Sequence, residues 1–217
     1  HADHDHHHGR SWLKVRSIIN HSSFSADAKA TALSIYEKIA EAEASVHGET
    51  LETIHFHEVG RDEAIKNALG IGMALEAIKT RGQGSDQDAD KQLEILTSPI
   101  YDGKGTVICS HGEIPVPVPA VMALREKCTY TFETADVNME MVTPTGLASL
   151  MGIGAKPSDE SINQLKALRK AGNIIAETEI KGTRNTGRGG LRVYLLEGGS
   201  SPEINSVLDN KPDRRDE

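Results

Sequence analysis

Residues 26–47 constrain the fold more than any other segment, because they combine a start signal, an apolar stripe and a stop signal. Ser25 is a typical N-cap, and Gly48 follows the pattern at the point where many helices end in a left-handed glycine. The stripe, which has the spacing of one helix face, consists of Ile35, Tyr36, Ile39 and Val46. We predict one long helix over residues 26–47, against which the other elements must pack.

Two further helices are predicted on either side of it. Residues 11–20 begin at a capping Ser11, and their apolar side consists of Trp12, Val15, Ile18 and Ile19. Residues 61–79 have helical spacing through Ile65, Leu69, Met73 and Ile78. Gly70 and Gly72 weaken this third helix, since glycine is a poor helix former.

The rest of the chain alternates short strands with short helices. Alternating prolines at Pro115, Pro117 and Pro119 place their segment at a sheet edge, because proline cannot donate to a ladder. Helices are expected through Val121 to Arg125, after residues 143–146, and over about residues 159–171. Strands are expected at residues 51–57, 92–96, 105–110, 129–137, 173–180 and 191–197.

This order predicts an α+β fold: mixed helices and sheet in a single compact domain with a polar internal loop. The absence of regular strand–helix alternation argues against a doubly wound sheet. The expected organisation is a histidine-rich tract at residues 1–10, the α+β domain at residues 11–198 and a disordered tail at residues 199–217. The aperiodic segment 81–91 is a candidate internal boundary.

Composition excludes several classes of function. A formal net charge of −8 disfavours a nucleic-acid partner. No apolar run approaches the roughly 20 residues that span a bilayer, so no membrane partner is expected. The polar start does not resemble a signal peptide, and Cys109 and Cys128 are too few for a disulfide framework. We therefore expect a cytoplasmic protein.

The first eight residues hold half of the ten histidines, interleaved with aspartates. These histidines are His1, His4, His6, His7 and His8. Imidazole suits nickel, zinc and copper, and such a tract can bind these ions without prior folding. A natural metal-buffering tract is the favoured interpretation, because purification tags rarely carry aspartates between the histidines.

The segment "IHFHEVG", residues 54–60, places two histidines and a carboxylate together. On a strand, His55 and His57 project from one face roughly 7 Å apart, from which two imidazoles can converge on an ion. Residues His111 and Glu113 supply another histidine and carboxylate. From spacing alone, a polar strand that faces solvent is the commoner explanation of a His-x-His pair.

Two glycine-containing segments are candidates for anion binding. "TPTG", residues 143–146, offers the hydroxyls of Thr143 and Thr145 and a free backbone at Gly146, which suit phosphate. "KGTRNTGRGG", residues 181–190, adds Arg184 and Arg188. From the residues alone, a simple helix N-cap and a long hairpin loop are the more common explanations.

Four segments together resemble one protein family in their order and spacing. They are "AEAEASVHG", "IHFHEVG", "HGEIPVPVPA" and "MVTPTGLASL". They are similar to the nickel insertion proteins that mature the nickel-pincer cofactor of lactate racemase, often called LarC. A histidine-rich tract upstream of the first helices is also similar, and the resemblance runs from residue 1 to about residue 197.

The resemblance implies a chelatase, classed as a lyase, that inserts Ni²⁺ into a pyridinium-3,5-bisthiocarboxylic acid mononucleotide. It also implies hydrolysis of CTP with Mg²⁺ or Mn²⁺. The metal would be held by His55, His57, His111 and Glu113, Glu58 and Glu63 would serve in catalysis, and the phosphate-binding segments would hold the mononucleotide. This chain would be the metal-presenting part, with a further C-terminal portion as partner and a homo-oligomeric assembly.

The chain departs from the family pattern in places that bear on catalysis. After H-E-V-G the family usually has a small apolar pair, then an aspartate and a second aspartate. Here Arg61, Asp62, Glu63 and Asn67 follow, and the glycine-rich segment near residue 185 is only partly kept. The family's opening segment and its C-terminal nucleotide-binding portion are also expected to be missing. The alternative hypothesis is a non-catalytic nickel storage protein or chaperone.

Overall fold

The computed structural model describes residues 9–82, 93–109, 112–158, 170, 174–183 and 190–196. The chain divides into two compact units, His1–Asp159 and Glu160–Glu217. The described elements are five helices and short strands, so the predicted mixed α+β class is confirmed. The predicted helix at 159–171 (except Lys170), most of the polar loop and the tail lie outside the described residues.

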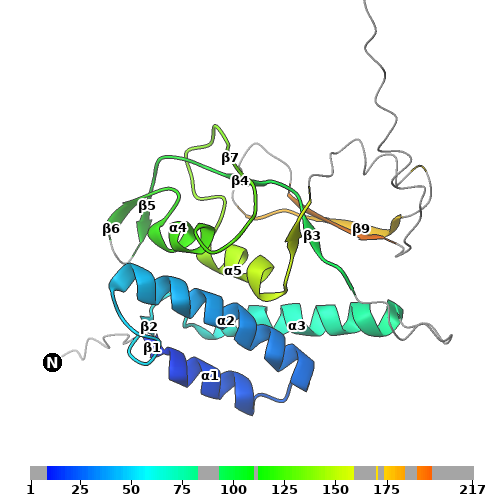
Figure 1. Cartoon of the computed structure of the whole chain (residues 1–217), viewed down its shortest axis with the longest axis horizontal. Helices are drawn as coiled ribbons and strands as arrows, with labels where there is room; N and C mark the ends of the chain where they lie inside the picture. Colours follow the sequence, from blue (N-terminus) through cyan, green and yellow to red (C-terminus); the bar gives the residue numbers. More distant parts are fainter. Residues whose placement is uncertain are drawn as a thin grey trace, which may run out of the picture. The chain divides into compact units, whose positions relative to one another are not determined.

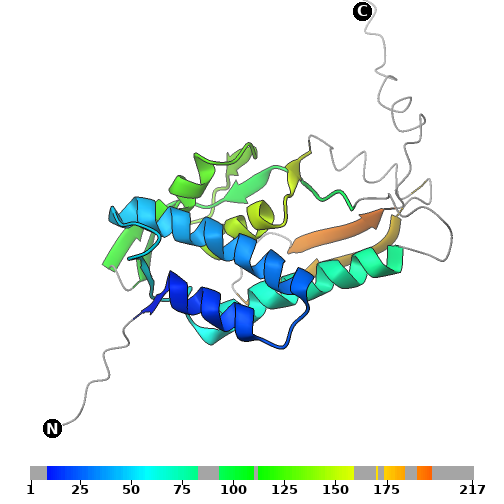
Figure 2. The ribbon, with the colours of Figure 1, turned by 60° about the horizontal axis from the view of Figure 1, so that its bottom comes forward.

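The helices of the first unit are α1 (Trp12–His21), α2 (Ala26–His47), α3 (Asp62–Gly82), α4 (Pro119–Arg125) and α5 (Pro144–Gly152). Helix α2 packs against the other four, with α1 and α5 on opposite sides of it (Figure 1). A second view shows α1 and α2 running side by side (Figure 2). The long helix predicted from the sequence is therefore the centre of the unit.

Caps fix the ends of α1 and α2 as predicted. Ser11 accepts a hydrogen bond from the Lys14 amide at 3.2 Å, and Ser25 accepts one from the Ala28 amide at 3.1 Å. Gly48 ends α2 with a φ of 67°. Each cap satisfies backbone groups that the first or last turn would otherwise leave without an intrahelical partner.

Two residues of the predicted stripes are exposed. Val46 is 40% exposed, because residues 45–50 at the end of α2 have left the packed region. Met73 is 49% exposed on α3. The large core side chains include Tyr36, Phe56, Ile19, Ile35, Ile39, Ile54, Leu124 and Leu147.

The strands form two-stranded ladders among the described residues. Three ladders are antiparallel: β1 (Arg10–Ser11) with β2 (His55–Phe56), β5 (Thr106–Cys109) with β6 (Gly112–Pro115), and β9 (Ile174–Ile180) with β10 (Leu191–Leu196). Two are parallel: β3 (Leu96–Thr97) with β8 (Lys156–Pro157), and β4 (Ile100–Asp102) with β7 (Phe132–Thr134). The strands at 51–57, 92–96 and 129–137 are shorter than predicted.

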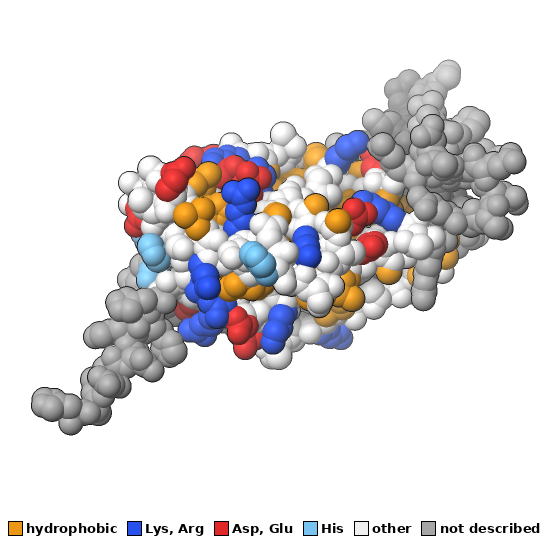
Figure 3. All heavy atoms as spheres, turned by 90° about the horizontal axis from the view of Figure 1, so that it is seen from below, with side chains coloured by type: hydrophobic (Ala, Val, Ile, Leu, Met, Phe, Trp, Pro, Cys, Tyr) orange, Lys and Arg blue, Asp and Glu red, His pale blue; other side chains and the backbone are white. Residues whose placement is uncertain are grey.

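One face of the protein carries side chains of both charges. On the described part of the face in Figure 3, acidic and basic side chains are interspersed.

Candidate functional site

The segment from His55 to Glu63, which we name the histidine edge, leads from β2 into α3. Ile54 and Phe56 are each 1% exposed, whereas His55 and His57 are both exposed. The alternation predicted from the sequence is therefore confirmed. Burial of the two apolar residues holds the histidines at the surface.

A hydrogen bond orients the His55 ring. Its Nδ1 lies 2.7 Å from the backbone carbonyl oxygen of Thr53. A carbonyl can only accept, so Nδ1 must be the nitrogen that carries hydrogen. In the neutral ring, the lone pair is then on Nε2, and histidines that bind metals are commonly oriented by such a bond.

The turn after β2 is held by two residues from other elements. The Tyr36 hydroxyl of α2 donates to the Val59 carbonyl at 2.8 Å, and Arg10 donates to the Gly60 carbonyl at 3.2 Å. Arg10 also pairs with Asp62 at the start of α3, which lowers the pKa of that carboxyl. Burial raises the pKa of Tyr36, so this hydroxyl remains a donor. The backbone below the histidines is thus a fixed frame.

A glycine at position 60 is required by close packing. A Cβ there would lie 2.7 Å from the Phe56 carbonyl oxygen, closer than side chains are found. Glu58 precedes this tight turn, and Glu63 lies in the first turn of α3; both are exposed. Their predicted catalytic roles remain predictions.

The other predicted metal ligands are on a different hairpin or outside the described residues. Glu113 of β6 accepts a hydrogen bond from the Thr106 hydroxyl of β5 at 2.6 Å. His111 and the five tract histidines are not described. Among the described residues, no group of three His, Cys, Asp or Glu side chains is placed to hold a metal ion. The four-residue metal set therefore stays a prediction.

The "TPTG" turn forms the N-terminus of α5. Thr143 is its N-cap, and its hydroxyl accepts from the Gly146 amide at 3.1 Å. The Thr145 carbonyl accepts from the Ser149 hydroxyl. The hydroxyl of Thr143 is thus used within the helix, as the simpler interpretation expected; phosphate binding stays a prediction. Arg184 and Arg188 lie outside the described residues.

Sequence analysis missed a buried ion pair between β4 and α4. Asp102, 1% exposed, accepts from Arg125 Nη2 at 2.9 Å and from the Gly103 amide at 2.8 Å. The Arg125 guanidinium also lies over the Phe132 ring, 4.1 Å from its centroid. The only sequence signal was an Asp-Gly pair at the end of an apolar strand.

Comparison with known proteins decides which family these residues belong to. The profile of the family "Nickel insertion protein" matches residues 1–197. The chain is a member of the nickel insertion protein family. No solved structure matches the chain.

Two relatives within this nickel insertion family carry the full name "Pyridinium-3,5-bisthiocarboxylic acid mononucleotide nickel insertion protein". The relative from Acetivibrio thermocellus is 37% identical over 156 residues, 72% of this chain and 35% of the relative. The one from Akkermansia muciniphila is 38% identical over 152 residues, 70% of this chain and 34% of the relative. A "Putative nickel insertion protein" of Methanosarcina mazei is 34% identical over 151 residues, 69% of this chain.

This nickel insertion family member spans about a third of the length of the curated relatives that it matches, 35% and 34% for the two fully named ones. None of its described helices is both long and apolar enough to cross a membrane.

Proposed function

We propose that this chain presents Ni²⁺ for insertion into pyridinium-3,5-bisthiocarboxylic acid mononucleotide, the compound named for two of its relatives. The observation that carries the proposal is the bond from His55 Nδ1 to the Thr53 carbonyl, which leaves the Nε2 lone pair of the neutral ring for a metal ion. Family membership supports insertion over the storage alternative. We place the reaction in the cytoplasm.

Neutral imidazole suits the first task of the site, which is to replace water on nickel. Imidazole nitrogen binds Ni²⁺ well, and thiocarboxylate sulfur can in turn replace imidazole. His55 and His57 are both exposed, one before and one after the buried Phe56, with His111 and Glu113 as the further ligands of the proposed set. The ion is cargo here, so the ligands must hold it without enclosing it.

Insertion also needs an acceptor for the proton that leaves the ring carbon as it bonds to nickel. Glu58 and Glu63 are exposed carboxylates on the same edge, and a carboxylate can act as general base when it reaches the proton. Glu63 lies in the first turn of α3. We assign the proton acceptor to this pair.

We assign none of the described residues to the nucleotide. A CTP–Mg²⁺ or CTP–Mn²⁺ complex is bound through carboxylates and phosphate-binding turns. Within the described ranges no group of three His, Cys, Asp or Glu side chains is placed to hold a metal ion, and the Thr143 hydroxyl caps its own helix. We therefore derive no step of this chain through the nucleotide. Thr143, Thr145 and Gly146, with Arg184 and Arg188, are proposed only to contact the substrate phosphate.

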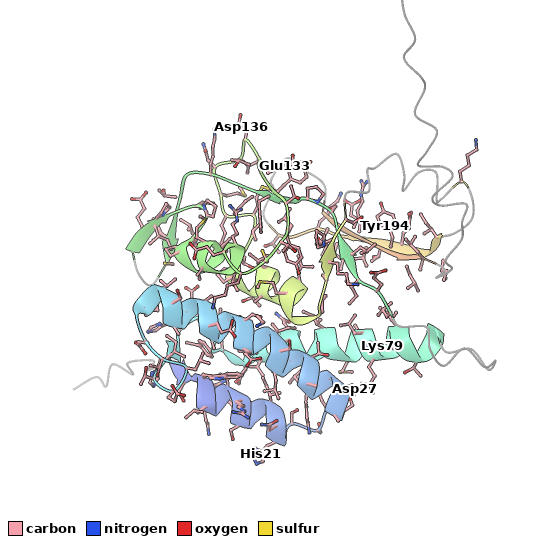
Figure 4. All side chains as sticks on the ribbon, in the orientation of Figure 1. His21, Asp27, Lys79, Glu133, Asp136 and Tyr194 are labelled. Carbon is pink, nitrogen blue, oxygen red and sulfur yellow. The ribbon has the colours of Figure 1, made fainter. Side chains whose placement is uncertain are left out.

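A nickel titration tests the proposal. In a chain that lacks residues 1–8, calorimetry should find one nickel site, and His55→Ala or His57→Ala should raise its Kd at least about tenfold. His21→Ala is the matched control, because His21 Nδ1 also lies 2.8 Å from a carbonyl oxygen, that of Ser17. Figure 4 shows His21 at the end of α1, pointing away from the other helices. Equal Kd values for all three variants would reject the site.

A further inference from the structure

The two histidines of the histidine edge are held in different ways. Within the β1–β2 ladder, Ser11 pairs with His55 and Arg10 with Phe56, so strand pairing sets the position of His55. The ladder ends at Phe56, the last residue of β2, and His57 follows it directly. The backbone that carries His57 must therefore be held by contacts of another kind.

Two side chains from outside the turn bind consecutive carbonyl groups within it. The Val59 carbonyl accepts from the Tyr36 hydroxyl at 2.8 Å, and the Gly60 carbonyl accepts from Arg10 Nη1 at 3.2 Å. Gly60 also folds back against Phe56, since a Cβ on it would lie 2.7 Å from the Phe56 carbonyl oxygen. The far end of the turn is thus fixed by donors that belong to α2 and β1.

Each donor is itself held in place. Tyr36 is 1% exposed, and its ring stacks on that of Trp12 with the centroids 6.4 Å apart. Arg10 pairs with Asp62 in the first turn of α3, and its backbone pairs with Phe56. A turn held by such donors is ordered before a ligand arrives, so binding does not have to order it.

Simpler explanations exist for both side chains. A buried tyrosine hydroxyl needs an acceptor in any case, and exposed ion pairs contribute little to stability. Neither explanation connects these residues with nickel. For Arg10, charge alone predicts the opposite effect, because a cation near the edge repels Ni²⁺ and its loss should strengthen binding.

We propose that Tyr36 and Arg10 are positioning residues for nickel, which hold the turn so that His57 and Glu58 stay within reach of the ion. The inference rests on the proposed nickel site of the histidine edge. Neither positioning residue contacts the ion, because each acts through a backbone carbonyl two or three residues after His57. His55, which the ladder holds, does not depend on them.

Nickel calorimetry on full-length chains tests this proposal. In every sample the five tract histidines are changed to serine, so that their binding does not obscure that of the edge. Tyr36→Phe keeps the ring and loses only the hydroxyl. Its matched control is Tyr130→Phe, because Tyr130 also donates to a backbone carbonyl at 2.8 Å, that of Ala155. Arg10→Gln is compared with Arg16→Gln, a loss of the same charge at an exposed position of α1.

Tyr36→Phe and Arg10→Gln should each raise the nickel Kd about three- to tenfold, and the double variant should raise it more than either, because the ion must then order the turn. Both controls should leave the Kd unchanged. In a His57→Ala background neither change should raise the Kd further, whereas in a His55→Ala background both should still raise it.

Equal increases in Kd for Tyr36→Phe and Tyr130→Phe would overturn the role of Tyr36, since the loss of any buried hydroxyl would then be enough. Unchanged or tighter binding by Arg10→Gln would overturn the role of Arg10. A further increase in the His57→Ala background would overturn both roles. Each of these results leaves the nickel site intact. If neither His55→Ala nor His57→Ala changes the Kd, the nickel site itself is wrong.

Discussion

Two charge pairs in this protein show how burial changes the contribution of a pair to the free energy of unfolding. The Asp102 side chain is 2% exposed and that of Arg125 20%, whereas Asp136 and Lys104 form a pair with side chains 90% and 53% exposed. Asp102 also accepts hydrogen bonds from two backbone amides, those of Gly103 and Val142. Because Val142 precedes the Thr143 cap, Asp102 joins the end of β4 to the start of α5.

Asp102→Ala should lower the free energy of unfolding by about 3–5 kcal/mol, because it leaves the Arg125 charge without its partner in a buried site. Asp136→Ala, on the exposed loop seen in Figure 4, should cost no more than about 1 kcal/mol. Urea unfolding of both variants measures the difference. Similar losses would show that Asp102 is solvated more than its burial indicates.

Asp62 makes the junction between β1 and α3 sensitive to acid. The hydrogen bond and charge of Arg10 lower the pKa of Asp62 in the folded protein. A lowered folded pKa contributes stability above the pKa of the unfolded carboxyl, and this contribution is lost as the pH falls through the folded value. Arg10→Gln should bring the pKa of Asp62 back toward its ordinary range.

Carbon-detected NMR titration of the Asp62 carboxyl measures this change. Arg16→Gln removes the same charge from α1 and leaves the Arg10–Asp62 pair in place, so the pKa should then stay low. If the two variants gave the same titration curve, the contact with Arg10 would not be the cause.

At the scale of elements, two glycines on one helix have different roles. A Cβ on Gly72 would lie 2.6 Å from the Ala28 carbonyl oxygen of α2, whereas one on Gly70 would meet nothing within 4 Å. Gly72 therefore permits α2 and α3 to approach closely. Helix propensity predicts that both glycines weaken α3; the close packing at Gly72 is a role that the sequence did not indicate.

Gly72→Ala should destabilise the protein by about 1–3 kcal/mol, because a methyl group must push two packed helices apart. Gly70→Ala should stabilise it by about 0.5–1 kcal/mol through helix propensity. Thermal unfolding of the two variants gives opposite shifts in Tm if the packing is as described. A loss of stability in both would contradict the open space at Gly70.

Helix ends and buried faces could be predicted because their signals are local. Ser25 and Gly48 stand directly before and after α2. The alternation of apolar and polar residues predicts that Ile54 and Phe56 are buried, as they are. The pairing of Arg10 with Phe56 has no such signal, because its partners are far apart in the chain. Within the candidate site, exposure of His55 was predictable, but its bond to a backbone carbonyl required coordinates.

For the whole molecule, we expect nickel binding without nickel-insertion turnover. The chain matches 35% of the Acetivibrio thermocellus relative, and insertion needs an oriented site that holds nickel and mononucleotide together. The chain alone should bind nickel yet give few or no turnovers with precursor, nickel and CTP. Adding the unmatched portion of that relative should restore turnover, as followed by absorbance of the product. Multiple turnovers by the chain alone would contradict this expectation.

The central place of α2 has a consequence for how the first unit opens. Helices α1, α3, α4 and α5 all pack on it, so its loss would expose an apolar face on each of them at once. Backbone amides near the middle of α2 can then exchange with deuterium only when the whole unit unfolds, whereas those at the ends of its neighbours exchange through smaller openings. Protection against hydrogen exchange should therefore be highest in the middle of α2 and lower at the ends of the helices that pack on it.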